Sequence, residues 1–215
     1  MRLRILEAAE NLYRNKTLSE VSMEDISERA DISRVTLYNY FTNQDCIILN
    51  IGIKNLQKIR ERQKEKKINL LTGFTQVHNL FQDLLIGFLE NPLNHKIWHY
   101  FLKLNADAET PTDIILEKIE RGTIVEDEIE YLMALYLKEM RMLEEVWIES
   151  IKLGIQDNTI RDDYDSEQLV HYLFTLLSGL VNTFGVEKFQ LEKVNLGENI
   201  FSQMTLELVS RFLRM

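Results

Sequence analysis

The spacing of apolar residues constrains the fold of this chain more than any other feature. Apolar residues recur three and four positions apart along almost the whole chain, and the alternation typical of half-buried strands is absent. Only 2 prolines and 8 glycines interrupt 215 residues, so long helices are favoured over turn-rich β structure. The hydrophobic share of 45% is ordinary for a chain with a real core. The sequence therefore predicts an all-α protein.

Helix-start signals divide the beginning of the chain into short helices. A first helix is expected near the start, and Ser22 followed by Asp25 forms a capping box for a second. Ser33 can cap a third, short helix. Thr42 with Asp45 forms another capping box, which opens a long helix to about residue 67. Because the stretch RADISR leaves only a brief turn between the second and third helices, the arrangement is typical of a helix-turn-helix unit.

The remaining chain also follows helical spacing. The expected helices cover roughly 74–88, 97–104, a segment after a start signal at Thr110 and Pro111, 123–154, 166–186 and 197–213. The sequence contains neither an internal repeat nor a low-complexity linker. We therefore expect the domain boundary within the long helix that follows Thr42.

Charge is distributed unevenly along the chain. Residues 1–67 carry 13 Lys and Arg against 10 Asp and Glu, a net charge of +3. Residues 68–215 carry 12 against 24, a net charge of −12. Such asymmetry indicates a head that faces an anion, carried on an acidic body. An equally good interpretation is a solvated helix, because much of the basic excess lies in KNLQKIRERQKEKK.

The segment SRVTLYNYF, residues 33–41, has two different faces when it is folded as a helix. Leu37 and Phe41 point to one side and hold the helix on its support. The opposite face carries a small apolar residue, a hydroxyl, an amide and a phenol: Val35, Thr36, Asn39 and Tyr40. An exposed face of this kind is typical of a recognition helix that enters a major groove.

The side chains of this face match chemical groups of duplex DNA. Thr36 and Tyr40 can donate to phosphate oxygens, which carry no sequence information. Arg34 and Asn39 can contact base edges, with guanine and adenine as their usual partners, and Val35 can touch a thymine methyl. The alternative is an ordinary three-helix corner whose tyrosines are half-buried fillers.

The stretch MEDISERADISRVTLYNYFTNQDCI resembles the DNA-binding signature of the tetracycline-repressor (TetR) family of transcriptional regulators. The resemblance covers roughly residues 3–50, and the rest of the chain is similar to the family in plan. It implies a helix-turn-helix DNA-binding domain over 1–45, joined by a long helix to a ligand-binding and dimerisation domain over 46–215. The dimer helices are then those near 166–186 and 197–213.

The same resemblance implies a homodimeric repressor that binds double-stranded operator DNA and is released by a small apolar or aromatic molecule. The implied DNA contacts are Ser22, Arg34, Val35, Thr36, Tyr38, Asn39, Tyr40 and Gln44. The family often has glycine where Asp31 and Val35 stand, and lysine where Gln44 stands. Glu24 and Asp25 lie near the expected DNA backbone, where a phosphate would be repelled.

Two sets of apolar side chains are expected in the body. A pocket with an adaptable aromatic and methionine lining is predicted at Phe81, Leu85, Trp98, Phe101, Met133, Tyr136, Met140 and Trp147. For any single one of these residues, simple filling of the core is the alternative. The last two helices are apolar on two faces, which predicts a dimer interface at Phe174, Leu177, Val181, Phe201, Met204 and Leu208.

The sequence supports other functions less well. His95 and His99 share a helical face but have no sequence partners typical of a metal site, so neither a metal nor a cofactor is predicted. A helical enzyme is the second hypothesis, but the chain has no nucleophile elbow or phosphate loop, so we expect no catalytic residues. The third hypothesis is a helical protein–protein interaction module with a degenerate helix-turn-helix, because Glu24 and Asp25 oppose phosphate binding.

The expected location is the cytoplasm, without membrane association. The start of the chain mixes acids and bases, unlike a signal peptide. No segment approaches the run of about 18 apolar residues that a membrane span needs. A single cysteine, Cys46, excludes an internal disulfide and fits a reducing compartment.

Overall fold

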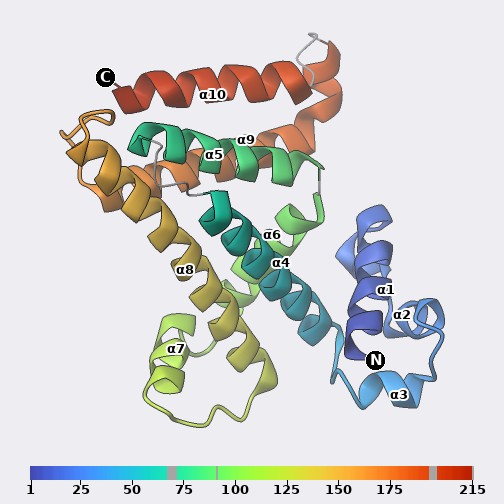
Figure 1. Ribbon diagram of the computed structural model, residues 1–215. Coiled ribbons are helices and arrows are strands. Elements are labelled where there is room, and N and C mark those ends of the chain that lie inside the picture. Colours follow the sequence, from blue (N-terminus) through green and yellow to red (C-terminus); the bar gives the residue numbers. More distant parts are fainter. Residues whose placement is uncertain (67–71, 91, 194–197, 215) are drawn as a thin grey trace. The chain divides into compact units, whose positions relative to one another are not determined.

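The computed structural model describes residues 1–66, 72–90, 92–193 and 198–214. Within these ranges it describes the side chains too, except those of residues 66, 88–90, 92, 181–193, 198, 199 and 201. These ranges contain helices and no strand, which confirms the predicted all-α class. In chain order the helices are α1 Arg2–Asn15, α2 Met23–Arg29, α3 Arg34–Tyr38, α4 Gln44–Lys66, α5 Gly73–Glu90, α6 Pro92–Asp107, α7 Thr112–Glu120, α8 Glu128–Gln156, α9 Ser166–Lys193 and α10 Glu198–Arg214 (Figure 1). Among the described helices, none has a stretch both long and apolar enough to cross a membrane.

The chain divides into two compact units. The first consists of Met1–Gln57 and Pro92–Met140, and the second of Lys58–Asn91 and Arg141–Met215. Each unit therefore combines two separate stretches of sequence, and the long helices α4 and α8 each contribute to both. The predicted functional boundary at residue 45 stays a prediction.

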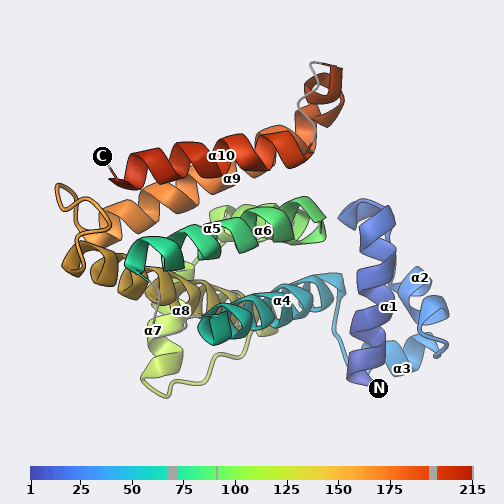
Figure 2. The same cartoon turned by 45° about the horizontal axis from the view of Figure 1, so that its top comes forward.

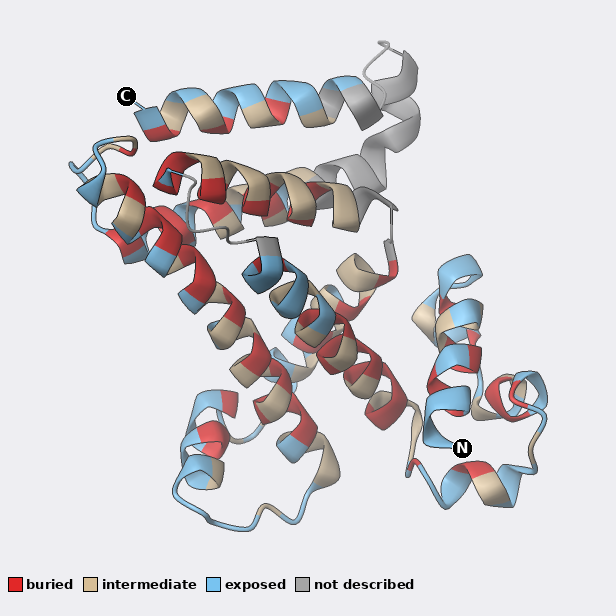
Figure 3. Cartoon of the chain, viewed as in Figure 1, coloured by how far each residue is buried: buried red, intermediate tan, exposed pale blue. Residues whose placement is uncertain are grey.

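In the first unit, the helices of the amino-terminal part share a small core. Helix α1 packs against α2 and α6, and α2 packs against α3 (Figures 1 and 2). Their inward faces are buried, as Figure 3 shows for the amino-terminal helices. The fully or almost fully buried members of this core are Ile5, Ala9, Tyr13, Ile26, Ala30, Leu37 and Phe41. Burial of each large apolar side chain contributes roughly 1.5–3 kcal/mol, which is how three short helices hold together.

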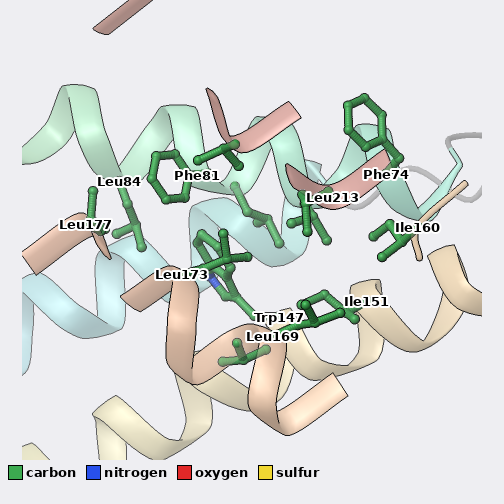
Figure 4. Packing of buried hydrophobic residues seen from close by; sticks show 14 of the residues in the cluster. Phe74, Phe81, Leu84, Trp147, Ile151, Ile160, Leu169, Leu173, Leu177 and Leu213 are labelled. Carbon is green, nitrogen blue, oxygen red and sulfur yellow. The ribbon is translucent and has the colours of Figure 1, made fainter. Parts of the chain in front are cut away.

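The second unit has the larger apolar core. Helix α5 packs against α9 and α10, and α8 adds Trp147 to the same cluster (Figures 2 and 4). The Phe81 ring meets the Trp147 ring edge-on, with 6.2 Å between ring centres. At one end of this core, a side chain at Gly73 would overlap the backbone of Gly154, so the two helices approach each other closely there.

Several helix starts differ from the predictions. Helix α6 begins at Pro92, ahead of residue 97, and the N-cap of α7 is Pro111 rather than Thr110. Helix α8 begins at Glu128, because the Asp127 carboxylate accepts hydrogen bonds from the N–H groups of Ile129 and Glu130 at 2.8 and 2.9 Å. The cap predicted near residue 123 is therefore wrong. Helix α4 begins at Gln44 with Asn43 as its cap, since the Asn43 side chain accepts from the Cys46 N–H at 3.0 Å. At the starts of α8 and α4, an Asp or Asn further along the chain accepts from the first free N–H groups of the helix, as these residue types commonly do.

Candidate nucleic-acid interface and ligand-binding residues

Two side-chain caps build the unit formed by α2, the following turn and α3. The Ser22 hydroxyl accepts from the Asp25 N–H at 3.1 Å, and the Asp25 carboxylate accepts from the Ser22 N–H at 2.7 Å. Hydrogen bonds from the hydroxyl and the backbone of Ser22 hold the pKa of Asp25 below its usual range. At α3, the Ser33 hydroxyl accepts from the Thr36 N–H at 3.0 Å. Both predicted caps are confirmed, and each stabilises its helix by about 1 kcal/mol.

The turn between α2 and α3 depends on Asp31, whose φ of 51° lies in the left-handed region. Within the turn, the Ile32 N–H donates to the Ser27 carbonyl at 3.0 Å. Arg4 of α1 donates to the Asp31 carbonyl at 2.7 Å and holds the turn from outside. Aspartate adopts positive φ more readily than most residues, so the turn forms here without glycine.

Helix α3 is buried on one face and exposed on the other. Leu37 is 0% and Phe41 is 1% exposed, whereas Val35 is 72% and Tyr38 is 54% exposed. Tyr40, just after the helix, is 39% exposed. The predicted division of this segment into two faces is therefore confirmed, and the DNA contacts of the outer face stay predictions.

Besides Ser22, three polar residues of the predicted interface have partners within the chain. The Thr36 hydroxyl lies 2.8 Å from the Ser33 hydroxyl. Arg34 forms an ion pair with Glu24 of α2, and both side chains are more than half exposed. The Gln44 amide donates to the Leu18 carbonyl at 2.6 Å and holds the start of α4 against the turn Leu18–Glu20. To contact a base, Arg34 must leave Glu24 or be shared with it. Asn39, at the end of α3, is exposed.

Helix α1 adds a basic residue that the sequence pattern did not single out. The Arg2 guanidinium lies 4.4 Å from the centre of the Phe41 ring and donates to the Tyr40 carbonyl at 3.3 Å. It also donates to the Asn50 side chain at 3.1 Å. Arg2 therefore places a positive charge beside the exposed end of the recognition segment, where it can attract phosphate. The basic start MRLR was its only signal in the sequence.

Helix α6 contacts the amino-terminal helices through two polar side chains. The Lys96 ammonium donates to the carbonyls of Tyr13 and Lys16, both at 3.1 Å, and so caps the end of α1. The Tyr100 hydroxyl donates to the Asp45 carboxylate at the start of α4. Burial, and secondly this hydrogen bond, raise the pKa of Tyr100 above its usual range, so the phenol stays a neutral donor.

The predicted pocket residues fall into two groups, one in each unit. In the first unit, the Phe101 and Tyr136 rings stack with 4.6 Å between their centres, and Trp98 stacks on Phe101 at 5.8 Å. Burial raises the pKa of Tyr136 above its usual range. Met133 is buried and Met140 is half-buried. These five residues thus include an aromatic stack that a flat or apolar molecule could extend.

The other three predicted pocket residues belong to the core of the second unit. Phe81 and Leu85 are 0% exposed and Trp147 is 1% exposed. The Trp147 indole N–H donates to the Gln63 side chain at 3.2 Å (Figure 4 shows Trp147 within its cluster). Their packing agrees with the alternative of simple core filling, and a ligand-binding role for any of the eight residues stays a prediction.

The predicted dimer residues differ in their exposure. Leu177 is 3% exposed and belongs to the core of its own chain, and Phe174 is half-buried. On α10, by contrast, Ile200, Met204 and Leu208 are 48%, 58% and 56% exposed at intervals of one turn. Two further predicted contacts lie outside the residues whose side chains are described: Val181 and Phe201.

The remaining titratable residues singled out from the sequence are in the first unit. The Nε2 atoms of His95 and His99 lie 2.8 Å apart. Burial first, and the charge of His99 second, lower the pKa of His95 to about 4. Burial raises the pKa of Cys46 to about 11, so it stays a thiol and packs as a small apolar group, as predicted. Nowhere in the described part of the chain do three or more potential metal ligands gather.

Comparison with known proteins identifies the amino-terminal part. Residues 5–51, from α1 into α4, match the model of the tetR family of bacterial regulatory proteins. Over 49 residues the chain is 39% identical to the HTH-type transcriptional regulator EthR of Mycobacterium tuberculosis, and this match covers 23% of each protein. The chain thus matches less than a quarter of this curated relative's length.

The whole chain resembles solved structures in fold. A transcriptional regulator from Saccharomonospora viridis in complex with choline is 17% identical, with a TM-score of 0.70 over 99% of this chain and 96% of that one. FadR of Bacillus subtilis in complex with stearoyl-CoA is 16% identical, with a TM-score of 0.63 over 99% and 100%. A tetR-family regulatory protein from Rhodococcus RHA1 is 12% identical, with a TM-score of 0.68 over 99% of this chain and 96% of that one. Residues 5–51 therefore match the amino-terminal domain of the tetR family of bacterial regulatory proteins, and the whole chain shares the fold of these solved structures.

Proposed function

We propose that this protein is a transcriptional repressor that binds operator DNA through α3 and is released by a small apolar or aromatic molecule. The observation that carries the proposal is the outer face of α3, where Val35 is 72% and Tyr38 is 54% exposed although Leu37 behind them is fully buried. A solvated helix does not need apolar and aromatic side chains on its outer face. A recognition helix does, because it contacts thymine methyls and the sugar–phosphate backbone.

The contacts of this face define separate roles. Thr36 and Tyr40 offer hydroxyls to phosphates, so they support binding to any duplex. Arg34 is the residue that contacts a base, and its contact to guanine requires that its ion pair with Glu24 breaks. Because Glu24 also repels phosphate, we expect modest affinity that falls steeply with salt.

The proposal is tested by fluorescence anisotropy with the promoter DNA of the protein's own gene and with a random duplex. We expect Thr36→Ala and Tyr40→Ala to weaken binding to both duplexes about equally. Arg34→Ala should relax specificity by roughly 1–3 kcal/mol at one base position. Arg121, just after the end of α7, has a side chain that is 77% exposed. Arg121→Ala removes the same charge there and serves as the matched control.

Two results would contradict this assignment. If Arg121→Ala weakened binding as much as Arg34→Ala, the effect would be one of net charge. If the wild-type protein bound neither duplex at low salt, the interaction-module alternative with a degenerate helix-turn-helix would be favoured.

We also propose that the protein is a homodimer formed through α9 and α10. The support is the exposed apolar row of Ile200, Met204 and Leu208, because such a row normally meets a partner. Met204→Glu should convert the dimer to monomer in sedimentation, since a charge would enter an apolar interface. Gln156→Glu, at the exposed end of α8, adds the same charge elsewhere and should leave the dimer intact. A stable wild-type monomer at micromolar concentration would refute the proposal.

The ligand is proposed from the aromatic groups of the body. The solved regulators with stearoyl-CoA and choline have the same fold, which supports a small-molecule site without specifying its ligand. An inducer must bind the DNA-free form better, and operator DNA must then weaken the inducer by the same factor. Calorimetric titration of a candidate with and without saturating operator tests this, and equal affinities would exclude it as the inducer.

A further inference from the structure

One pair of side chains has no part in the DNA-binding or apolar-ligand roles described above. His95 and His99 lie one turn apart on α6, with their Nε2 atoms 2.8 Å apart. Their rings are inclined at 76° with 4.3 Å between centres, so the two imidazoles lie side by side in direct contact. His99 is exposed and His95 is half-buried, which leaves the pair accessible from the solvent side.

The separation of the two nitrogens is close to that found when two imidazoles share a metal ion. Two lone pairs that face each other repel, so without a cation one imidazole must carry its proton on Nε2. A metal ion at about 2.0–2.1 Å from each nitrogen holds the nitrogens about 2.8–3.4 Å apart, for bond angles from square to tetrahedral. The observed 2.8 Å lies at the lower end of this range.

We propose that His95 and His99 form a binding site for a divalent transition-metal ion such as Ni²⁺, Cu²⁺ or Zn²⁺. Imidazole nitrogen is a preferred ligand of these ions. Residues at i and i+4 of a helix are neighbours, so the chelate needs no rearrangement of the backbone. Two imidazoles supply only part of the coordination shell of such an ion, so water or a bound molecule would fill the remaining positions.

The site adjoins the contact between α6 and α1. Lys96 stands between the two histidines in the sequence and donates to the carbonyls of Tyr13 and Lys16. An ion that cross-links His95 and His99 stiffens this turn of α6 where it holds the end of α1. An effect of the metal on DNA binding follows from this position, and that consequence rests on the proposed function.

Calorimetric titration of Ni²⁺ alone into the full-length protein, with any affinity tag removed, tests the site. We expect one ion per chain for the wild type. His99→Gln changes an exposed position and should leave the fold intact, as circular dichroism checks. His95→Gln and His99→Gln should each weaken binding at least about tenfold, equivalent to 1.4 kcal/mol. His171→Gln changes an exposed histidine of α9 and should bind Ni²⁺ like the wild type.

The proposal is overturned if the wild type binds no Ni²⁺, or if His99→Gln and His171→Gln bind it equally well. The titration needs no DNA, so its result does not depend on the proposed repressor function. Repetition of the anisotropy measurement with Ni²⁺ then tests the coupling separately. A protein that binds Ni²⁺ but no promoter DNA would support the metal site and contradict the proposed function.

Discussion

The buried hydrogen bond between Gln63 and Trp147 allows a quantitative test of the second core. Both side chains are 1% exposed, and the indole N–H donates to the Gln63 amide oxygen at 3.2 Å. The Gln63 amide nitrogen donates in turn to the Leu80 carbonyl at 3.4 Å. This polar pair lies among apolar side chains, so removal of either partner leaves the other buried and unsatisfied.

We expect unequal and non-additive effects on the free energy of unfolding. Gln63→Met keeps the side-chain length but strands the indole N–H, which costs about 1–3 kcal/mol. Trp147→Phe strands the amide oxygen and also loses packing, which together cost about 2–4 kcal/mol. The double variant has neither stranded group. Its loss should therefore be smaller than the sum of the single losses by at least about 1 kcal/mol.

The assay is urea unfolding followed by far-UV circular dichroism, because one substitution removes a fluorescent tryptophan. Protein concentration is held constant, since the stability of an oligomer depends on it. Gln156→Met, at an exposed amide, is the control and should change stability by less than about 0.5 kcal/mol. Additive losses in the double variant would show that the hydrogen bond does not hold these side chains together, and would refute this account of the core.

Three further predictions concern backbone and charge. Gly73→Ala should lower the free energy of unfolding by about 1–3 kcal/mol or more in urea titration, because the added carbon overlaps the Gly154 backbone. Asp31→Val should cost about 1–2 kcal/mol at a φ of 51°, whereas Asp31→Gly should not destabilise; equal losses would contradict the strain argument. Burial, and secondly the charge of His99, lower the pKa of His95 from 6.5 to about 4 in the folded protein. As the pH drops from about 6.5 to 4, the unfolded chain therefore takes up this proton before the folded chain does, and the free energy of unfolding falls. In urea titrations between pH 6.5 and 4, the free energy of unfolding should fall less steeply for His95→Gln than for the wild type. Identical slopes for the two proteins would refute this role of His95.

The sequence by itself determined that the chain is helical and that the segment over residues 33–41 has one buried and one exposed face. The caps at Ser22 and Ser33 and the buried side of Leu37 depend only on neighbours within four positions. Such local patterns can be read without a fold because one helical turn spans them. The same reasoning was wrong at the start of α8, where Asp127 supplied the cap that was expected near residue 123.

Only the tertiary structure decided which distant residues meet. The eight predicted pocket residues share aromatic or apolar character, yet Trp98 and Phe81 belong to different compact units. Arg34 forms an ion pair with Glu24, and the Lys96 ammonium donates to the Tyr13 carbonyl at the end of α1. The sequence around Arg34 and Lys96 does not predict these partners. The exposure of Met204 and the burial of Leu177 also could not be told apart from their similar spacing. The physical reason is that a helical pattern tells which side of a helix is apolar, whereas the packing of whole helices decides what covers that side.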